Sequence, residues 1–451
     1  MTDPHVAMLM LSLFIVVILL GFPVAFTLMA LGVGFGYFAY YDAARMQSIV
    51  DNQIFGVLVD QTYSVMSSEV LTAVPLFLFM GYVVERSNIV ERMFSTLQIA
   101  AKGVPGAMAV AALLTCALFA SATGLVGAVV SLMGVIALPQ MLKARYDATY
   151  AAGVICAGGC LGILMPPSVM LIVYSATTSV SVTKLLAGAL LPGLMLAGLY
   201  VLYVVGRAVL QPSIAPRPRE DAPPKVSRLQ LSGLLLTSFV PLAVLVVAVL
   251  GAMLLGLAKP AEAAAIGALG SLLLAIVYRE LTWDGVRESV YLTLRTTAVL
   301  GWLFVGSWTF SSVFSQLGGE QFVKDFVLSL SLTPLTFLIL TQVVIFLLGW
   351  PLEWPEIVIV FVPLLLPLVK HFGIDPLVFG VLIALNLQMS FLTPPRAIAA
   401  RGLRAIAPPD VKLGQVVAGS LPYFAILVLA MVLVHAFPGI ALWLPEYLYG
   451  K

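Results

Sequence analysis

The sequence predicts an all-α polytopic membrane protein, built as an inverted-topology repeat with two re-entrant helical hairpins and two broken helices. Hydrophobic residues make up 61% of its 451 residues and charged residues only 10%, whereas about 25% of residues are charged in soluble domains. Apolar stretches recur along the chain, many near the ~20 residues that cross a bilayer. The second half repeats the proline spacing of the first. These observations exclude a soluble globular protein.

Six apolar stretches occupy the first half of the chain. They cover residues 6–20, 22–40, 71–84, 107–142, 148–174 and 185–205. Val6–Leu20 has no basic residue before it and no small-residue cleavage site after it. We therefore expect a retained span rather than a signal peptide.

A polar, proline-rich linker over residues 207–228 separates a first repeat (1–206) from a second (229–451). Its basic residues outnumber Glu220 and Asp221. Because basic loops stay in the cytoplasm, we expect the linker to be cytoplasmic. The N-terminus, which has Asp3 and no basic residue, is then periplasmic, and the same count places the C-terminus there.

This topology requires an odd number of crossings in the first half, so one of the six stretches cannot cross. Residues 107–142 are the candidate, because Lys102 precedes them, Lys143 and Arg145 follow them, and a Ser/Thr/Gly run at 121–127 interrupts them. Non-helical backbone is tolerated at membrane depth only where it lines a cavity or is buried in protein. We interpret the segment as a re-entrant hairpin.

The second half follows the same plan. Its apolar stretches cover residues 229–257, 261–278, 296–314, 334–369, 376–407 and 416–437. The stretch at 334–369 is interrupted at 349–355, which predicts a second hairpin that enters from the opposite face. An offset of 228 residues relates Pro139 to Pro367, Asp147 to Asp375 and Pro166-Pro167 to Pro394-Pro395. Matched halves of opposite topology are typical of secondary transporters.

Each Pro-Pro pair interrupts an apolar stretch and predicts a broken helix, over residues 148–178 and 376–407. Two prolines remove two backbone donors and push the preceding residue out of helical geometry. Freed carbonyls suit a cation, and half-helix amino ends suit a carboxylate. Ordinary proline kinks without a ligand are the alternative.

Few charges lie at membrane depth, where an ionisable residue is a functional hypothesis by default. Glu353 and Glu356 lie at the second hairpin tip, and Arg396, beside the second Pro-Pro pair, faces either a substrate carboxylate or Glu353. Glu262 is equally well explained as a first-turn carboxylate favoured by the helix dipole.

The three cysteines fall in apolar segments, and the three histidines have no spacing for a metal site or a catalytic triad. The net charge of +2 gives no reason to expect a nucleic-acid partner.

Motifs along nearly the whole chain resemble a known family. They lie at residues 74–81, 119–127, 138–147, 158–168 with Tyr174, 261–267, 362–367 and 386–395. The family is the large membrane subunit of tripartite ATP-independent periplasmic (TRAP) transporters, in the branch linked with dicarboxylates, mannitol and chloroaromatic acids. The resemblance implies an elevator-type importer of an organic acid in the bacterial inner membrane, without enzyme activity and without a cofactor other than coupling sodium ions. The implied partners are a separate small four-helix membrane subunit and a periplasmic substrate-binding protein.

The resemblance also implies site residues at matching positions. The first sodium site is expected at Ser121, Thr123, Gly159, Gly162 and Pro166. The second is expected at Gly349, Asn386, Ser390, Thr393 and Pro394. The candidate substrate contacts are Gly124, Ser168, Glu353 and Arg396. The chain departs from the family pattern at Arg396-Ala397, Lys259 and Cys160.

The chain has no G-x-x-x-x-G-K-[S/T] phosphate loop, so we expect ion gradients to supply the energy. The alternative hypothesis is a proton-coupled organic-anion transporter, or an ion-translocating subunit of a larger membrane complex. In either, Glu353 or Glu356 would relay protons.

Overall fold

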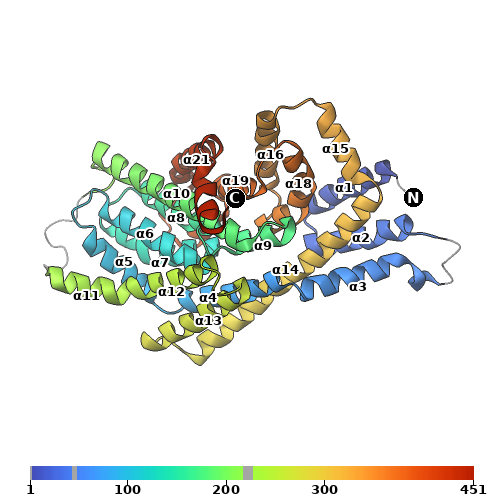
Figure 1. Ribbon diagram of the computed structural model, residues 1–451. Helices are drawn as coiled ribbons and strands as arrows, with labels where there is room; N and C mark the ends of the chain where they lie inside the picture. The colour runs from blue at the N-terminus through green and yellow to red at the C-terminus, as the bar shows by residue number, and fades with distance from the viewer. Residues whose placement is uncertain (1–2, 43–47, 217–226, 451) are drawn as a thin grey trace. The chain divides into compact units, whose positions relative to one another are not determined.

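The computed structural model describes residues 3–42, 48–216 and 227–450, and the described chain is helical without strands (Figure 1). In the first half the helices are α1 (Pro4–Leu19), α2 (Val24–Ala39), η1 (Ile49–Asp51), α3 (Gln53–Met66), α4 (Glu69–Glu85), α5 (Ile89–Ala100), α6 (Ala107–Thr123), α7 (Val126–Lys143), α8 (Ala148–Cys160), η2 (Leu161–Ile163), α9 (Val169–Thr178) and α10 (Val182–Leu210).

In the second half the helices are α11 (Arg228–Ser238), α12 (Val240–Leu254), α13 (Pro260–Val277), α14 (Trp283–Gln316), α15 (Gly319–Ser329), α16 (Pro334–Leu348), α17 (Trp354–Glu356), η3 (Ile357–Phe361), α18 (Val362–His371), α19 (Pro376–Leu392), α20 (Ile398–Ile406), α21 (Leu413–Ala436) and α22 (Gly439–Tyr449).

Many of these helices are long and apolar enough to cross a membrane. Among the described residues six qualify by length and composition: α7, α10, α13, α14, the continuous run Trp354–His371 and α21. Two bent pairs, α3–α4 and α11–α12, raise the number to as many as eight. The prediction of an all-helical, multi-span membrane protein with broken helices is confirmed.

Several helices were not predicted, because they are amphipathic rather than continuously apolar. In α5 the buried residues include Ile89, Met93 and Phe94, whose spacing marks one helical face. The helices α3, α15 and α22 also fall outside the predicted apolar stretches, and α14 begins well before its predicted stretch at residue 296.

The linker starts later than predicted. Helix α10 continues to Leu210 and includes Arg207, because the helix-breaking Pro212 comes only after Gln211. Residues 217–226 of the linker lie outside the described residues.

The chain folds into two compact units. Unit 1 comprises Met1–Thr72, Val173–Ser179 and Leu294–Pro376, and unit 2 comprises Ala73–Ile172, Val180–Thr293 and Leu377–Lys451. Each unit takes residues from both sides of the linker. The two inverted repeats stay a prediction, although helix starts recur at the predicted offset: α7 and α17 begin at Val126 and Trp354, and α8 and α19 begin at Ala148 and Pro376.

Unit 1 is held together by aromatic packing and one buried polar contact. The ring of Phe14 in α1 lies 5.3 Å from that of Phe310 in α14. The Ser307 hydroxyl donates to the Ile359 carbonyl at 2.9 Å, within the π-helical turn η3. This turn releases backbone carbonyls from the regular α-helical pattern, so Ser307 supplies a donor where one is needed.

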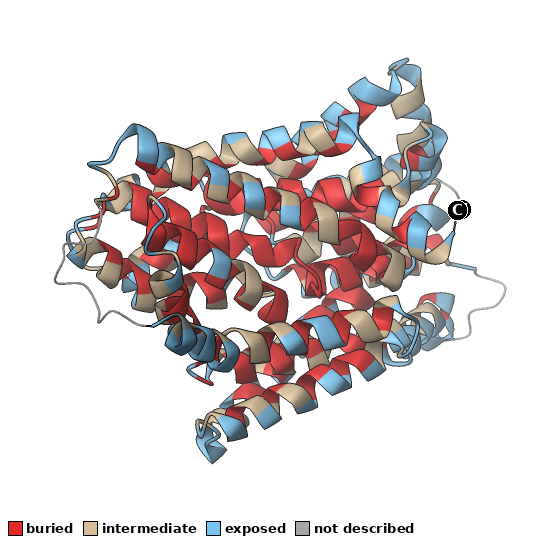
Figure 2. Ribbon diagram, turned by 60° about the vertical axis from the view of Figure 1, so that its left-hand side comes forward, coloured by how far each residue is buried: buried red, intermediate tan, exposed pale blue. Residues whose placement is uncertain are grey.

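Unit 2 contains the most deeply buried helices. Residues Tyr150–Cys160 of α8 and Leu377–Leu392 of α19 are all buried. Figure 2 shows the buried residues of the chain in red. Where α8 crosses α21, a Cβ added at Gly153 would lie 2.1 Å from the Gly419 carbonyl oxygen. Glycine at both positions therefore allows direct backbone contact between the helices.

Candidate functional site

In unit 2 the first hairpin tip, Gly124–Leu125 between α6 and α7, lies against the first break, residues 161–168 between α8 and α9. A Cβ added at Gly162 would lie 3.4 Å from the Ala120 carbonyl oxygen, near the end of α6. A Cβ added at Gly124 would lie 3.4 Å from the Val169 amide nitrogen, at the start of α9. The tip thus contacts the break on both sides.

Glycines make this close approach possible. Gly124 ends α6 with a φ of +63°, a left-handed conformation that side chains disfavour. A Cβ at Gly159 would lie 2.3 Å from a Val130 methyl carbon in α7, and one at Gly158 would lie 2.8 Å from the Cys116 sulfur in α6. The glycines of α8 therefore allow both α6 and α7 to pack closely against α8.

Two buried hydroxyls lie at the end of α6, close to this junction. The Ser121 hydroxyl donates to the Ala117 carbonyl and the Thr123 hydroxyl to the Phe119 carbonyl, each at 3.0 Å. Each oxygen can still act as an acceptor, and the Thr123 oxygen accepts the Leu125 N–H at 3.5 Å. A Cβ at Gly162 would lie 3.3 Å from Ala120, the residue before Ser121, whereas a Cβ at Gly81 of α4 would lie 3.3 Å from the Thr123 Cβ. The first predicted sodium site stays a prediction.

The helix ends at this junction carry opposite partial charges. The carboxyl ends of α6 and of the α8–η2 segment meet here, as do the amino ends of α7 and α9. Carboxyl ends attract cations and amino ends attract anions. The junction can therefore hold a cation beside a carboxylate.

Ser168, a candidate substrate contact, is fully buried and has a structural partner. Its hydroxyl donates to the Ile163 carbonyl at 2.6 Å across the first break. Pro166-Pro167, between them, is joined by a cis peptide bond. The side chain thus replaces a backbone donor that the prolines lack.

The second break, residues 393–397 in unit 2, is built differently. It follows α19, whose Asn386 and Ser390 are buried, and it contains Pro394-Pro395, also a cis peptide bond. The Thr393 hydroxyl donates to the Met389 carbonyl at 2.8 Å. The Thr393 carbonyl in turn accepts the Ala397 N–H at 3.0 Å.

Arg401 of α20 is a site residue that the sequence reasoning missed. Its guanidinium donates a hydrogen bond to the Pro395 carbonyl. Ala397 has a φ of +38°, a left-handed conformation, directly before α20 begins at Ile398. The sequence feature that could have indicated the contact with Pro395 is an arginine about one turn into the helix that follows a Pro-Pro pair.

The second predicted sodium set is divided between the two units. Gly349 is buried at the end of α16 in unit 1, where its N–H donates to the Ile345 carbonyl at 3.0 Å. The remaining four residues of the set belong to unit 2. Glu353 likewise lies in unit 1 and Arg396, which is half-buried, in unit 2.

Glu356 and Glu262 act as helix caps. The Glu356 carboxylate accepts the Glu353 N–H at 2.7 Å at the start of α17. The Glu262 carboxylate accepts the Lys259 N–H at 2.8 Å at the start of α13. Such contacts stabilise helix starts, so the capping explanation of Glu262 holds.

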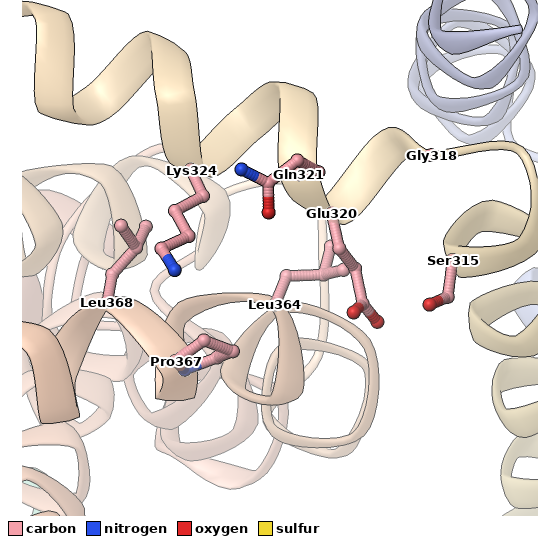
Figure 3. A pocket seen from close by; sticks show the side chains of 8 residues that line it. All are labelled: Ser315, Gly318, Glu320, Gln321, Lys324, Leu364, Pro367 and Leu368. Atoms are coloured by element: carbon pink, nitrogen blue, oxygen red, sulfur yellow. The ribbon is translucent and has the colours of Figure 1, made fainter.

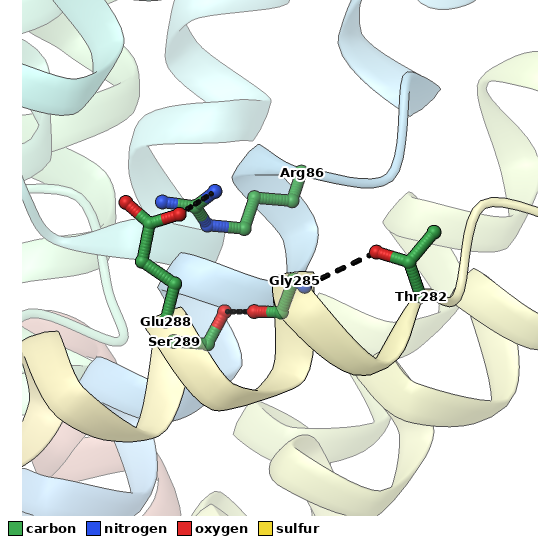
Figure 4. Close-up of polar contacts among 5 residues, drawn as sticks. All are labelled: Arg86, Thr282, Gly285, Glu288 and Ser289. Atoms are coloured by element: carbon green, nitrogen blue, oxygen red, sulfur yellow. Dashed lines mark hydrogen bonds and ion pairs between the residues drawn. The ribbon is translucent and has the colours of Figure 1, made fainter.

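Elsewhere in unit 2, a charged cluster joins the end of α4 to the start of α14. The Arg86 guanidinium lies 2.8 Å from the Glu288 carboxylate, and the adjacent turn contains the Gly285 N–H that donates to the Thr282 hydroxyl (Figure 4). Nearby, Arg92 lies 5.3 Å from the centre of the Tyr278 ring. Burial raises the pKa of the Tyr278 hydroxyl, and Arg92 opposes the shift. The ion pair is partly exposed, which limits its contribution to stability.

Unit 1 contains a cavity of about 350 Å³ between α15 and α18 (Figure 3). Glu320, Gln321 and Lys324 line one side, and Leu364, Pro367 and Leu368 line the other. None of these residues was a predicted site residue.

Among the described residues, no group of three or more His, Cys, Asp or Glu side chains has the geometry of a metal site. Cys116, Cys156 and Cys160 are buried free thiols.

Comparison with known proteins identifies relatives over most of the chain. The family model described as "Tripartite ATP-independent periplasmic transporter, DctM component" matches residues 11–440. The C4-dicarboxylate TRAP transporter large permease protein DctM of Pseudomonas aeruginosa is 30% identical, over 84% of this chain and 86% of its own length. The sialic acid TRAP transporter large permease protein SiaM of Vibrio cholerae is 29% identical, over 84% and 87%.

Two solved structures share the fold. The YdaH transporter of Alcanivorax borkumensis superposes with a TM-score of 0.62 at 19% identity, over 96% of this chain and 99% of that one. MtrF of Neisseria gonorrhoeae superposes with a TM-score of 0.61 at 12% identity, over 98% and 95%.

Proposed function

Because the chain belongs to the DctM component family of the tripartite ATP-independent periplasmic transporters, we propose that it imports an organic acid by sodium-coupled, elevator-type alternating access. Membership makes it a multi-pass transporter permease of the bacterial inner membrane, and not an enzyme. Family membership also implies a small membrane subunit and a periplasmic binding protein as partners. The proposal concerns its substrate class, its coupling ion and its mechanism.

One observation carries the proposal: the first hairpin tip contacts the first break. The carbonyl ends of two helices meet there, and two buried hydroxyls lie at the end of one of them, α6. Oxygen atoms are the ligands that hard cations such as sodium prefer. We assign the coupling ion to Ser121, Thr123, Gly159, Gly162 and Pro166.

The substrate class follows from the relatives and from helix polarity. Relatives are named for transport of C4-dicarboxylate, of sialic acid and, in Escherichia coli, of 2,3-diketo-L-gulonate. We propose a carboxylate substrate, held near Gly124 by the amino ends of α7 and α9. A cation bound at the adjacent carbonyl ends would attract that carboxylate, so that each ligand strengthens binding of the other.

The proposal also includes the membrane topology of the chain. We place the linker in the cytoplasm and both termini in the periplasm, with the two hairpins entering from opposite faces as parts of inverted repeats. The recurrence of helix starts at the 228-residue offset supports this arrangement.

Uptake in proteoliposomes tests the function. The permease is reconstituted with its small subunit and the ligand-loaded binding protein, and radiolabelled carboxylate uptake is measured under an inward sodium gradient. We expect uptake that collapses when the sodium gradient is dissipated. Uptake indifferent to sodium but driven by a proton gradient would reject sodium coupling.

The same uptake measurement decides between this proposal and the proton-coupled alternative. Glu353 and Glu356 were its proposed relay groups, and the Glu356 carboxylate already caps α17 through the Glu353 N–H.

A further inference from the structure

The two breaks differ in how their carbonyl groups are used. At the first break, the Pro167 carbonyl oxygen would lie 3.9 Å from a Cβ at Gly124 of the hairpin tip. At the second break the matching carbonyl, that of Pro395, accepts a hydrogen bond from the Arg401 guanidinium. The position that matches Arg401 at the offset of 228 is Val173, an apolar residue.

Arginine is suited to act as a permanent cation. Its guanidinium stays protonated in proteins and carries five donors. A sodium ion at the second break would compete with it for the Pro395 carbonyl and would be repelled by its charge. The Thr393 carbonyl already accepts the Ala397 N–H, so two of the carbonyls at this break have donors from within the chain.

We propose that the Arg401 guanidinium takes the place of a bound cation at the second break, so that only the first break binds a coupling sodium ion. Thr393 and Pro394 of the expected second sodium site directly precede Pro395, so a sodium ion held by them would lie beside the guanidinium charge. This inference rests on the proposed sodium coupling. It concerns the number of sodium ions bound, so it can be tested by measuring binding without measuring transport.

Direct counting of bound sodium tests the inference. The full-length chain and the variant Arg401→Met are reconstituted in lipid nanodiscs and equilibrated with radioactive sodium. Methionine keeps an apolar stem but removes the charge and the donors. We expect the variant to bind an additional sodium ion per chain, and added guanidinium ion to displace that ion. Equal sodium counts in the two proteins would overturn the inference.

Arg404→Ala is the matched control, because it removes an arginine from the same helix without removing the Pro395 contact. Its sodium count should equal that of the unmodified chain. If the unmodified chain bound no sodium while Arg401→Met bound it, sodium binding at the first break and sodium coupling would fail, and only the exclusion of sodium by Arg401 at the second break would be supported.

A second measurement avoids dependence on the folding of Arg401→Met. In the unmodified background, at a sodium concentration near half-saturation, Ser121→Ala should lower the amount of bound sodium, whereas the near-isosteric Thr393→Val should leave it unchanged. Loss of a sodium ion in Thr393→Val would overturn the inference by showing an occupied second site.

Discussion

The first and second breaks each contain a Pro-Pro pair joined by a cis peptide bond. The carbonyl groups near the two breaks, however, accept hydrogen bonds from different kinds of donor. The first is uncharged, fully buried and packed through glycines. The second has exposed prolines, followed by Arg396 and Arg401. Where Ser168 donates a neutral hydroxyl at the first break, the residue at the offset of 228 is Arg396.

This difference shows that a repeated backbone pattern does not require repeated chemistry. In the proposed arrangement a bound sodium ion offsets the carbonyl dipoles of the uncharged first break, whereas at the second break the Arg401 guanidinium supplies positive charge from within the chain. If Arg401 replaces one bound sodium ion, the transporter would carry fewer sodium ions in each cycle than one with a sodium ion at both breaks.

The largest expected effect comes from removing the close packing between α8, which leads into the first break, and α21. Gly153→Ala places a Cβ 2.1 Å from the Gly419 backbone oxygen, and backbone cannot rotate away as a side chain can. We expect a loss of about 3 kcal/mol or failure to fold, measured by thermal unfolding of purified protein. The matched position in the second half is the buried Val381, so this requirement is specific to the first half.

Gly198→Ala is the control, because a Cβ there meets nothing within 4 Å. It should leave stability unchanged or raise it by roughly 0.5–1 kcal/mol. Equal stability of the two variants would contradict the packing argument.

The next effect concerns ion affinity at the first break. Ser121→Ala removes one hydroxyl oxygen from the proposed site, and we expect the sodium concentration for half-maximal uptake to rise about tenfold, equivalent to ~1.4 kcal/mol. Thr115→Val on the same helix alters a buried hydroxyl outside the proposed sodium set and should not change sodium affinity. A matching loss in both variants would indicate a general disturbance of α6.

A smaller effect is expected at the hydroxyl that bridges the first break. Ser168→Ala leaves the buried Ile163 carbonyl without its side-chain donor, at a cost of about 1–3 kcal/mol. Thermal unfolding would measure this loss. Unchanged stability would mean that another donor replaces the hydroxyl and that the two breaks differ less than their hydrogen bonds suggest.

The smallest effect is expected at the second hairpin. In Glu356→Gln the amide oxygen can still accept the Glu353 N–H, so we expect uptake with an unaltered pH profile. A shifted profile would restore the proton-relay hypothesis and would make the second half a site of ion coupling.

The sequence predicted the features that depend on strong local signals. Glycine and hydroxyl residues between flanking charges marked the first hairpin, and the Pro-Pro pairs marked both breaks. These signals sufficed because a proline without an N–H or a charge in an apolar run leaves the backbone few options.

Features that depend on tertiary contacts were not predictable. The amphipathic α5 and α15 have no apolar run and depend on partners for burial. The Arg401 contact depends on the backbone conformation at Ala397. Its φ of +38° is unusual for alanine, so the sequence does not indicate it. The offset of 228 did not reveal that α3 and α4 are separated at Ser67–Ser68 while α14 is continuous through the matching positions.

The contact between Gly153 and Gly419 also constrains how the chain can be made. A ribosome adds about 5–20 residues per second, so α21 emerges on the order of tens of seconds after α8. During that interval the glycine surface of α8 must be covered by lipid, by the insertion machinery or by a temporary helix neighbour. Assembly of unit 2 is therefore completed late in synthesis, and truncation before α21 would leave α8 without its final neighbour.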